Sequence, residues 1–217
     1  MVKNNKLPNE IIPFLSNDKD FHEKPSDDWG SFPSPVNCII AGGRNIGKTR
    51  VMKNILLRQT IYDRIVVYTP LEDTQEYDDI DVEYVNEIPP FSFFDKSQHN
   101  CFIIEDCDVK NDLNREQRTL LGNYYRVASH MNIDLFTITQ NPFDITPTLR
   151  RVANVVILFK NNDLDMLNSL CRKFNVKSCD LKAIFDTFTP FDCLIIDDTR
   201  PKHLRLRKNL FQIIEIE

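Results

Sequence analysis

The stretch Gly42-Gly43-Arg44-Asn45-Ile46-Gly47-Lys48-Thr49 decides the fold of this 217-residue chain. It has the complete spacing G-x-x-x-x-G-K-[ST] of a phosphate-binding loop. An apolar run, 36–41, precedes it, and a helix-like run, 51–57, follows it, which is the strand, loop and helix context that the motif requires. The sequence therefore predicts a P-loop nucleotide-binding fold.

The residue types in this loop indicate its chemistry. Glycines let consecutive backbone N–H groups turn inward around phosphate oxygens, and the helix that follows adds the positive end of its dipole. We expect Lys48 to reach the β and γ phosphates of ATP and the Thr49 hydroxyl to bind Mg²⁺. The residues expected to contact the nucleotide are Gly42, Gly43, Arg44, Asn45, Ile46, Gly47, Lys48, Thr49 and Arg50. For Arg44 the sequence leaves open whether it contacts the nucleotide or a neighbouring subunit.

The composition limits the function classes. The net charge is −5, so the chain is not a general polycation, and any nucleic-acid contact must come from a local patch or a ring of subunits. The six cysteines form no C-x-x-C pair, which favours reduced thiols in an intracellular protein. No apolar run approaches the length of a membrane span, so we expect a soluble protein with no membrane contact.

The chain divides into an arm and one domain. Residues 1–35 are polar and rich in proline, which is typical of an arm, and residues 36–217 form the predicted P-loop ATPase domain. The arm carries a few apolar anchors, among them Trp29, and packs either on its own sheet edge or on a neighbouring subunit. The sequence leaves both possibilities open.

Strand-like and helix-like runs alternate through the domain. We expect strands at 36–41, 65–68, 82–85, 101–104, 134–139, 152–159 and 193–196, and helices at 48–58, 113–130 and 164–174. This βαβ rhythm predicts an α/β fold with a mostly parallel sheet and helices on both faces.

A phosphate loop needs a carboxylate that holds Mg²⁺ and a second group that polarises the attacking water. Two acid pairs end apolar strands, Glu105-Asp106 and Asp197-Asp198. The first is favoured because a helix and then a strand with a polar tip follow it. The second is interpreted as the solvated turn of a terminal hairpin. Register assigns Mg²⁺ to Glu105 and the water to Asp106, although side-chain length leaves the reverse order open.

Gln140 follows the predicted strand 134–139 and precedes Asn141-Pro142. If this strand neighbours both the phosphate loop and the acid pair, the amide lies beside the γ phosphate. An uncharged donor and acceptor at that place can hold the attacking water.

Taken together, these motifs resemble the FtsK–HerA superfamily of pumping ATPases. The segments that carry the resemblance are 42–49, Phe102 to Asp106, the helix end at Arg126 to Asn132, Phe136 to Pro142, Thr146 to Arg151, Val155 to Phe159, and the closing stretch Leu194 to Asn209. Within the superfamily the chain is most similar to the poxvirus-type genome-packaging ATPases of large double-stranded DNA viruses and their relatives in virophages and Polinton-like elements.

The resemblance implies a RecA-like ASCE core with a C-terminal β-hairpin, assembled as a homo-oligomeric ring. It implies Mg²⁺-dependent ATP hydrolysis that pumps double-stranded DNA into a preformed capsid, with a capsid or portal component as partner. The expected location is the host cytoplasm or viral factory, or the virion itself.

The chain departs from its relatives where an arginine is expected. Relatives often carry Arg-His about eleven residues before the strand-tip glutamine, where this chain has Ser129-His130. The candidates for an arginine that acts on a neighbouring subunit's γ phosphate are Arg126, Arg150 and Arg151, in no order.

Positive charge gathers near the C-terminus, at Arg200, Lys202, Arg205, Arg207 and Lys208. Alternation with Leu204 and Leu206 predicts that Arg205 and Arg207 share one face of a strand and contact duplex phosphates. A charged edge strand is the alternative. A non-pumping nucleotide-dependent assembly or switch protein is the alternative function, although the chain lacks the N-K-x-D motif of a GTP switch.

Overall fold

The computed structural model describes residues 3–5, 32–59, 61–70, 76–77, 79–109, 111–160, 168, 172–174, 176–210 and 212–215. Its strands are β1 (Lys3–Asn5), β2 (Asn37–Ala41), β3 (Arg64–Tyr68), β4 (Glu83–Val85), β5 (Asn100–Glu105), β6 (Ile133–Thr139), β7 (Val155–Phe159), β8 (Cys193–Asp197), β9 (Leu206–Lys208) and β10 (Gln212–Glu215). Its α-helices are α1 (Lys48–Arg58), α2 (Arg115–Val127), α3 (Pro147–Val152) and α5 (Ser178–Asp186).

Short 3₁₀ turns complete the described elements: η1 (Phe91–Phe93), η2 (Ala128–Met131), η3 (Pro142–Asp144), η4 (Arg172–Phe174) and η5 (Lys202–Leu204). Within the part of the chain that the structure describes, no helix is both long and apolar enough to cross a membrane.

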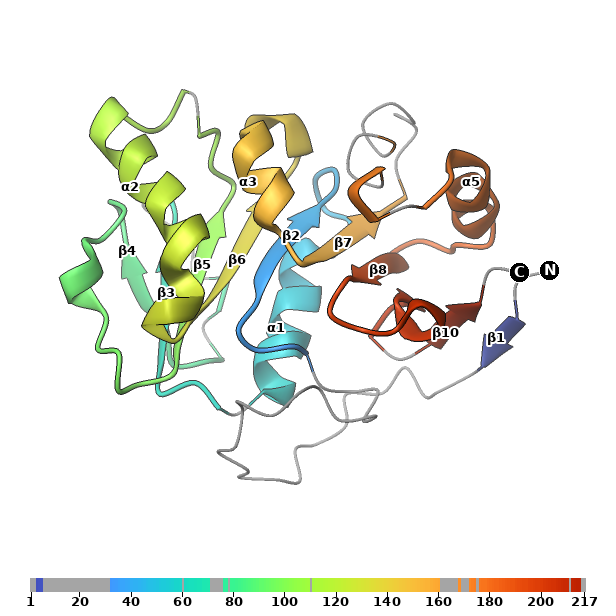
Figure 1. Ribbon diagram of the computed structural model, residues 1–217, viewed down its shortest axis with the longest axis horizontal. Coiled ribbons are helices and arrows are strands. Elements are labelled where there is room, and N and C mark those ends of the chain that lie inside the picture. The colour runs from blue at the N-terminus through green and yellow to red at the C-terminus, as the bar shows by residue number, and fades with distance from the viewer. Residues whose placement is uncertain are drawn as a thin grey trace.

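One sheet runs through the molecule in the order β1-β10-β9-β8-β7-β2-β6-β5-β3-β4 (Figure 1). The block from β7 to β4 is parallel, and the remaining strands pair antiparallel from β8 to β1. The predicted α/β class, the mostly parallel sheet and the C-terminal hairpin are therefore confirmed.

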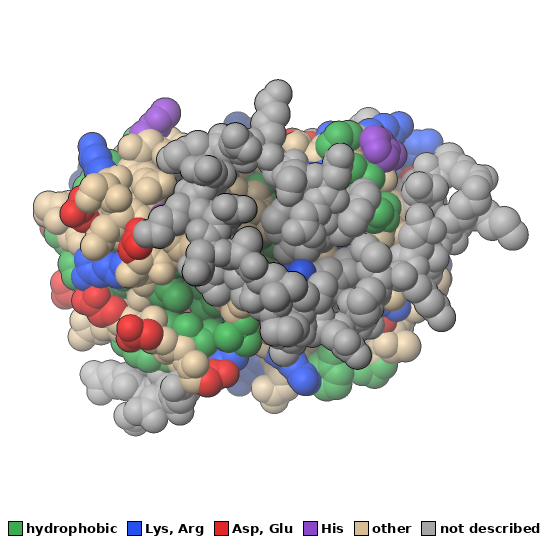
Figure 2. All heavy atoms as spheres, turned by 90° about the horizontal axis from the view of Figure 1, so that it is seen from below, with side chains coloured by type: hydrophobic (Ala, Val, Ile, Leu, Met, Phe, Trp, Pro, Cys, Tyr) green, Lys and Arg blue, Asp and Glu red, His purple; other side chains and the backbone are tan. Residues whose placement is uncertain are grey.

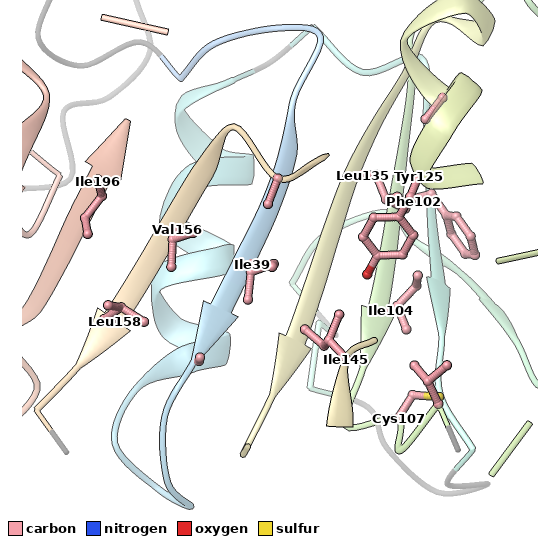
Figure 3. Packing of buried hydrophobic residues seen from close by; sticks show 14 of the residues in the cluster. Ile39, Phe102, Ile104, Cys107, Tyr125, Leu135, Ile145, Val156, Leu158 and Ile196 are labelled. Atoms are coloured by element: carbon pink, nitrogen blue, oxygen red, sulfur yellow. The ribbon is translucent and has the colours of Figure 1, made fainter. Parts of the chain in front are cut away.

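Helices cover both faces of the sheet, as predicted. On one face, Met52, Ile55 and Leu56 of α1 pack against alternate residues of β2, β5, β6 and β7. On the other, α2, α3 and α5 pack against the remaining residues, including the Ile39, Phe102 and Leu135 side chains in Figure 3. Every residue of β5 and β6 is buried, because central strands of a covered parallel sheet have no solvated face.

The strand order places the phosphate loop beside the acid pair. β6 lies between β2 and β5, with Ala41 opposite Thr139 and Glu105 opposite Ile138. All three strands run parallel, so the loop after β2, the acids at the end of β5 and Gln140 after β6 meet at the carboxyl edge, at the top of Figure 1.

Several element boundaries differ from the expected ones for local reasons. α2 begins at Arg115 because Asn114 and Gln117 form a capping box, and its last turn tightens into η2. The segment expected as one strand from Val152 divides at Ala153, where α3 has ended and before β7 begins. Most of the helix expected at 164–174 lies outside the described residues.

Two parts of the expected arm are described, and both contact the domain. β1 pairs antiparallel with β10, with Lys3 opposite Glu215, so this strand extends the chain's own sheet. Phe32 is buried against Phe136, and its carbonyl accepts a 2.8 Å hydrogen bond from Gln59 Nε2. Other arm residues lie outside the described part of the chain.

Candidate nucleotide and metal site

The phosphate loop has backbone geometry that two of its glycines make possible. A Cβ on Gly42 would lie 2.4 Å from Ile46 Cδ1 and 2.9 Å from Phe159 Cβ, so no side chain fits there. Gly47 has φ +102°, a conformation that side chains disfavour, and its carbonyl accepts the first α1 hydrogen bond from Val51 N at 2.9 Å. The loop therefore turns tightly onto the amino end of α1, where backbone N–H groups and the helix dipole favour an anion.

Lys48 lies inside this turn and is only 7% exposed. Its Nζ donates a 2.9 Å hydrogen bond to the Gly43 carbonyl. Burial lowers the pKa of Lys48, whereas the nearby carboxylates of Asp106 and Glu105 raise it. These acids favour the protonated amine, which is the form that binds phosphate.

Glu105 connects the end of β5 to the phosphate loop. Its Oε1 accepts hydrogen bonds from Thr49 Oγ1 at 3.1 Å and from the Tyr77 hydroxyl at 3.4 Å. The carboxyl is 7% exposed, and burial, followed by the charge of Glu76, raises its pKa to about 7. Its second oxygen, Oε2, is buried and has no hydrogen-bond partner among the described residues.

Asp106 follows in a left-handed backbone conformation, with φ +43°. Its N–H donates to the Ile138 carbonyl at 3.0 Å, which fixes the turn at the end of β5 beside β6. Its Oδ1 is also buried and without a hydrogen-bond partner within the described residues. A non-glycine residue held in this conformation at a strand tip is a feature of functional sites.

This donor set fits Mg²⁺. The Thr49 hydroxyl lies within hydrogen-bond distance of Glu105, and two buried carboxylate oxygens here lack a protein partner. Mg²⁺ prefers hard oxygen ligands and is usually held by one or two carboxylates together with phosphate oxygens and water. Thr49 and Glu105 would therefore hold the ion, with the Asp106 carboxylate beside them.

Glu76 is a member of this cluster that sequence reasoning missed. Its Oε2 accepts a 2.5 Å hydrogen bond from Thr49 Oγ1, so two carboxylates compete for one hydroxyl. The neighbouring Tyr77 is fully buried against Glu105. Both residues belong to the connection between β3 and β4, where the sequence has an acidic run and no recognisable motif.

Gln140 meets the phosphate loop through Arg44, whose Nε donates a 3.1 Å hydrogen bond to Gln140 Oε1. The expected neighbourhood of β6 with both loops is therefore present. Of the other loop residues, Asn45 is exposed with φ +58°, Ile46 is half-buried, and Arg50 is exposed in the first turn of α1.

The three candidate arginines lie on α2 and α3, which pack on the face of the sheet opposite α1. Arg126 is exposed near the end of α2, and the preceding Tyr125 carbonyl accepts a hydrogen bond from Asn37 at the amino end of β2. Arg150 is half-buried on α3, donates to the Ile145 carbonyl at 3.0 Å, and has its guanidinium 5.0 Å from the Phe143 ring centre. Arg151 is exposed on the same helix.

The interpretation of Asp197 as part of a solvated turn is wrong. Asp197 is fully buried, and its Oδ2 pairs with Arg200 Nε at 3.1 Å and with Arg207 Nη2 at 2.9 Å. Because β8 runs antiparallel to β7, Asp197 lies opposite Val155 at the amino edge, far from the phosphate loop. The Asp197 carboxylate is thus engaged by two arginines away from the phosphate loop. Glu105-Asp106 is the acid pair that lies beside this loop.

The predicted face shared by Arg205 and Arg207 is also wrong. Arg207 is 1% exposed because β9 lies between β8 and β10 inside the sheet. Arg205 precedes β9 in a helical conformation and pairs with Asp198 at 3.2 Å, and Lys208 pairs with Asp192 at 2.7 Å. On the face seen in Figure 2, acidic side chains of the described residues gather mainly toward the left, and basic side chains are scattered over the left, the centre and the right.

Comparisons with known proteins agree with this geometry at the level of the fold. No family model and no curated protein sequence matches the chain. One similar solved structure is the genome-packaging NTPase B204 of Sulfolobus turreted icosahedral virus 2 in complex with ATPγS. It matches with a TM-score of 0.57 and 14% sequence identity, and the match covers 84% of this chain and 97% of that chain.

Two further structures match with similar scores. EssC (ATPases 2 and 3) of Geobacillus thermodenitrificans gives a TM-score of 0.56 at 13% identity, over 84% of this chain and 39% of that chain. The pCW3 conjugation coupling protein TcpA with ATPγS gives 0.52 at 14% identity, over 82% and 59%. The chain therefore has a RecA-like P-loop NTPase fold, as expected from its sequence.

Proposed function

We propose that this protein is an ATPase that uses hydrolysis to move double-stranded DNA, as the subunit of a viral genome-packaging motor. The observation that carries the proposal is the position of β6 between β2 and β5, which gathers Lys48, Glu105 and Gln140 at one edge of the sheet. This set contains a phosphate-binding cation, a metal-binding acid and a polar group for water, as ATP hydrolysis requires.

In this proposal Lys48 and the loop N–H groups bind the β and γ phosphates. Thr49 and Glu105 hold Mg²⁺, which would neutralise charge that develops on the phosphate oxygens. Asp106 accepts the proton of the attacking water, and Gln140 orients that water. Arg44, hydrogen-bonded to Gln140, gives the amide a contact that changes when a γ phosphate enters the loop.

A ring would complete the site with an arginine from the next subunit. Arg126, Arg150 and Arg151 belong to α2 and α3, which cover the same face of the sheet. In this proposal one of these arginines acts in trans, on the γ phosphate bound by a neighbouring subunit. Such a contact requires a repeated head-to-tail interface, which a homo-oligomeric ring provides.

The DNA path is assigned to the segment after Gln140. The C-terminal arginines Arg200, Arg205 and Arg207 are engaged in ion pairs, so we take 144–151 as the candidate segment near the carboxyl edge. Contacts from Lys and Arg to phosphates bind duplexes without reading sequence. Transport into a capsid, a portal partner and a location in the host cytoplasm, viral factory or virion rest on the sequence resemblance, and the likeness to B204 supports them.

The test is Mg²⁺-dependent ATP hydrolysis with and without long double-stranded DNA. We expect DNA to stimulate hydrolysis in the wild-type chain and to have no effect on Lys48→Ala. Slow hydrolysis that DNA leaves unchanged would instead support the nucleotide-dependent switch. A matched control is Leu57→Ala, which removes an exposed apolar side chain near the far end of α1.

A further inference from the structure

Phe191 is an aromatic side chain that the fold holds in solvent. It lies between α5 and β8 and is 62% exposed, more than the other exposed large apolar side chains of the described residues. Its backbone has φ +71°, in the left-handed region that side chains other than glycine, asparagine and aspartate seldom adopt. Neither burial nor backbone preference accounts for a phenylalanine at this position, and strained residues cluster at ligand-binding sites, which makes Phe191 a candidate binding residue.

The turn that carries Phe191 is fixed by Asp192. One carboxylate oxygen, Oδ2, accepts hydrogen bonds from Thr189 N and Thr189 Oγ1 at 2.7 and 2.8 Å and pairs with Lys208 at 2.7 Å. The other accepts a 2.9 Å hydrogen bond from Asn209 Nδ2. The exposed ring is therefore presented from a rigid turn, which lowers the entropy lost when a ligand binds it.

The ring lies beside the phosphate loop. A Cβ placed on Gly47 would be 3.7 Å from Phe191 Cδ1 and 3.6 Å from Phe159 Cε1. Phe159 is the last residue of β7. In the sheet, β7 lies on one side of β2, and β6 and β5 lie on the other. The two aromatic rings thus approach the loop from the side away from Glu105 and Gln140.

This arrangement matches the two ends of a nucleoside triphosphate. The metal and the γ phosphate belong next to Glu105 and Gln140, while the loop holds the middle of the triphosphate. The nucleoside then leaves the loop on the side of β7 and β8. There the exposed Phe191 ring offers a flat apolar surface, and a nucleobase has a matching face.

We propose that Phe191 stacks on the base of the bound nucleotide. The proposal rests on the proposed function, because it assumes that the triphosphate occupies the loop from Gly42 to Thr49. A phenyl ring has no hydrogen-bonding group, so Phe191 favours purines over pyrimidines through stacking area and does not itself separate ATP from GTP. Its contribution is to affinity for the nucleoside and not to the cleavage of phosphate.

The experiment compares two probes by calorimetry in the presence of Mg²⁺: ATPγS, which has a base, and tripolyphosphate, which has none. The proteins are wild type, Phe191→Ala, Phe191→Trp and the control Leu57→Ala, whose lost side chain is exposed but remote from the loop. We expect Phe191→Ala to weaken ATPγS binding about tenfold and to leave tripolyphosphate binding unchanged. Phe191→Trp should bind ATPγS at least as tightly as wild type, since it keeps the aromatic surface.

Two results would overturn the proposal. Phe191→Ala could bind ATPγS like wild type while its assembly falls, which would assign the ring to a subunit contact. It could also weaken both probes equally, which would mean that the ring supports the loop and not the base. A wild-type chain that bound neither probe would refute nucleotide binding itself, and this outcome is distinguishable because it does not depend on Phe191.

Discussion

Glu105→Gln should make the nucleotide-free protein more stable while abolishing hydrolysis. Glu105 is 7% exposed, has one oxygen without a partner among the described residues, and lies near the charges of Glu76 and Asp106. Burial is the largest cause that raises its pKa to about 7. The folded chain therefore holds an ionised carboxyl that it disfavours, and glutamine removes the charge while keeping the shape.

The magnitude follows from the two pKa values. A pKa of about 7 in the folded state, against 4.5 for an ordinary glutamate, corresponds to about 3 kcal/mol once the carboxyl is ionised in both states. Because the folded-state pKa is the higher one, wild-type stability falls as pH rises from about 4.5 to about 7 and stays low above it. Glu105→Gln should thus gain about 3 kcal/mol at pH 8 and about 1 kcal/mol at pH 5.

The assay is urea unfolding between pH 5 and pH 8, without Mg²⁺ or nucleotide, read as the free energy of unfolding. Asp197→Asn is the matched control, because Asp197 is buried but pairs with Arg200 and Arg207. Breaking that network should destabilise the protein at pH 7 by about 3 kcal/mol. A Glu105→Gln variant that is no more stable than wild type at pH 8, or whose gain is the same at every pH, would refute the reasoning.

Three further predictions concern catalysis. Lys48→Ala should weaken ATP binding and reduce hydrolysis to background in a phosphate-release assay, because it removes the cation that pairs with the β and γ phosphates; near wild-type turnover would contradict the assignment of the loop. Asp106→Asn should bind MgATP with wild-type affinity in a filter assay but fail to cleave it, and a loss of metal-dependent binding would assign the Mg²⁺ role to Asp106. Arg126, Arg150 and Arg151 are each changed to Ala, and the variant that lacks the trans-acting arginine should hydrolyse ATP poorly. Its activity should partly return when it is mixed with Lys48→Ala subunits, which still carry the arginine. Normal hydrolysis in all three variants would leave the ring model without a trans-acting arginine.

Local sequence carries much of the fold and of the phosphate site. The loop from Gly42 to Thr49 binds phosphate mainly with its own backbone N–H groups. A motif of eight residues with the right flanking segments is therefore enough to predict the phosphate site. Glu105 ends a fully buried strand, and its apolar run is visible in the sequence. The sequence leaves open whether the strand before Gln140 neighbours both the phosphate loop and the acid pair, because local residues do not fix which strands pair, and the order β2-β6-β5 in the structure answers this.

The errors arise where a partner lies far away in the chain. The alternation around Arg207 indicates a strand with one solvated face, but β9 is an inner strand and Arg207 contacts Asp197 on the neighbouring strand β8. That contact depends on antiparallel pairing and tertiary packing, which alternation does not encode. Glu76 and Phe191 are placed by connections whose course depends on the folded sheet, and neither belongs to a recognisable motif.

The central claim is that hydrolysis at this phosphate loop moves the protein along duplex DNA, and displacement of a third strand tests it most directly. A labelled oligonucleotide that forms a triplex is placed on a long duplex, and its release is followed with time after ATP is added. We predict release that requires ATP and Mg²⁺, that takes longer when more duplex precedes the triplex, and that is absent in Lys48→Ala. Steady ATP hydrolysis on the same DNA with the third strand still bound would contradict translocation.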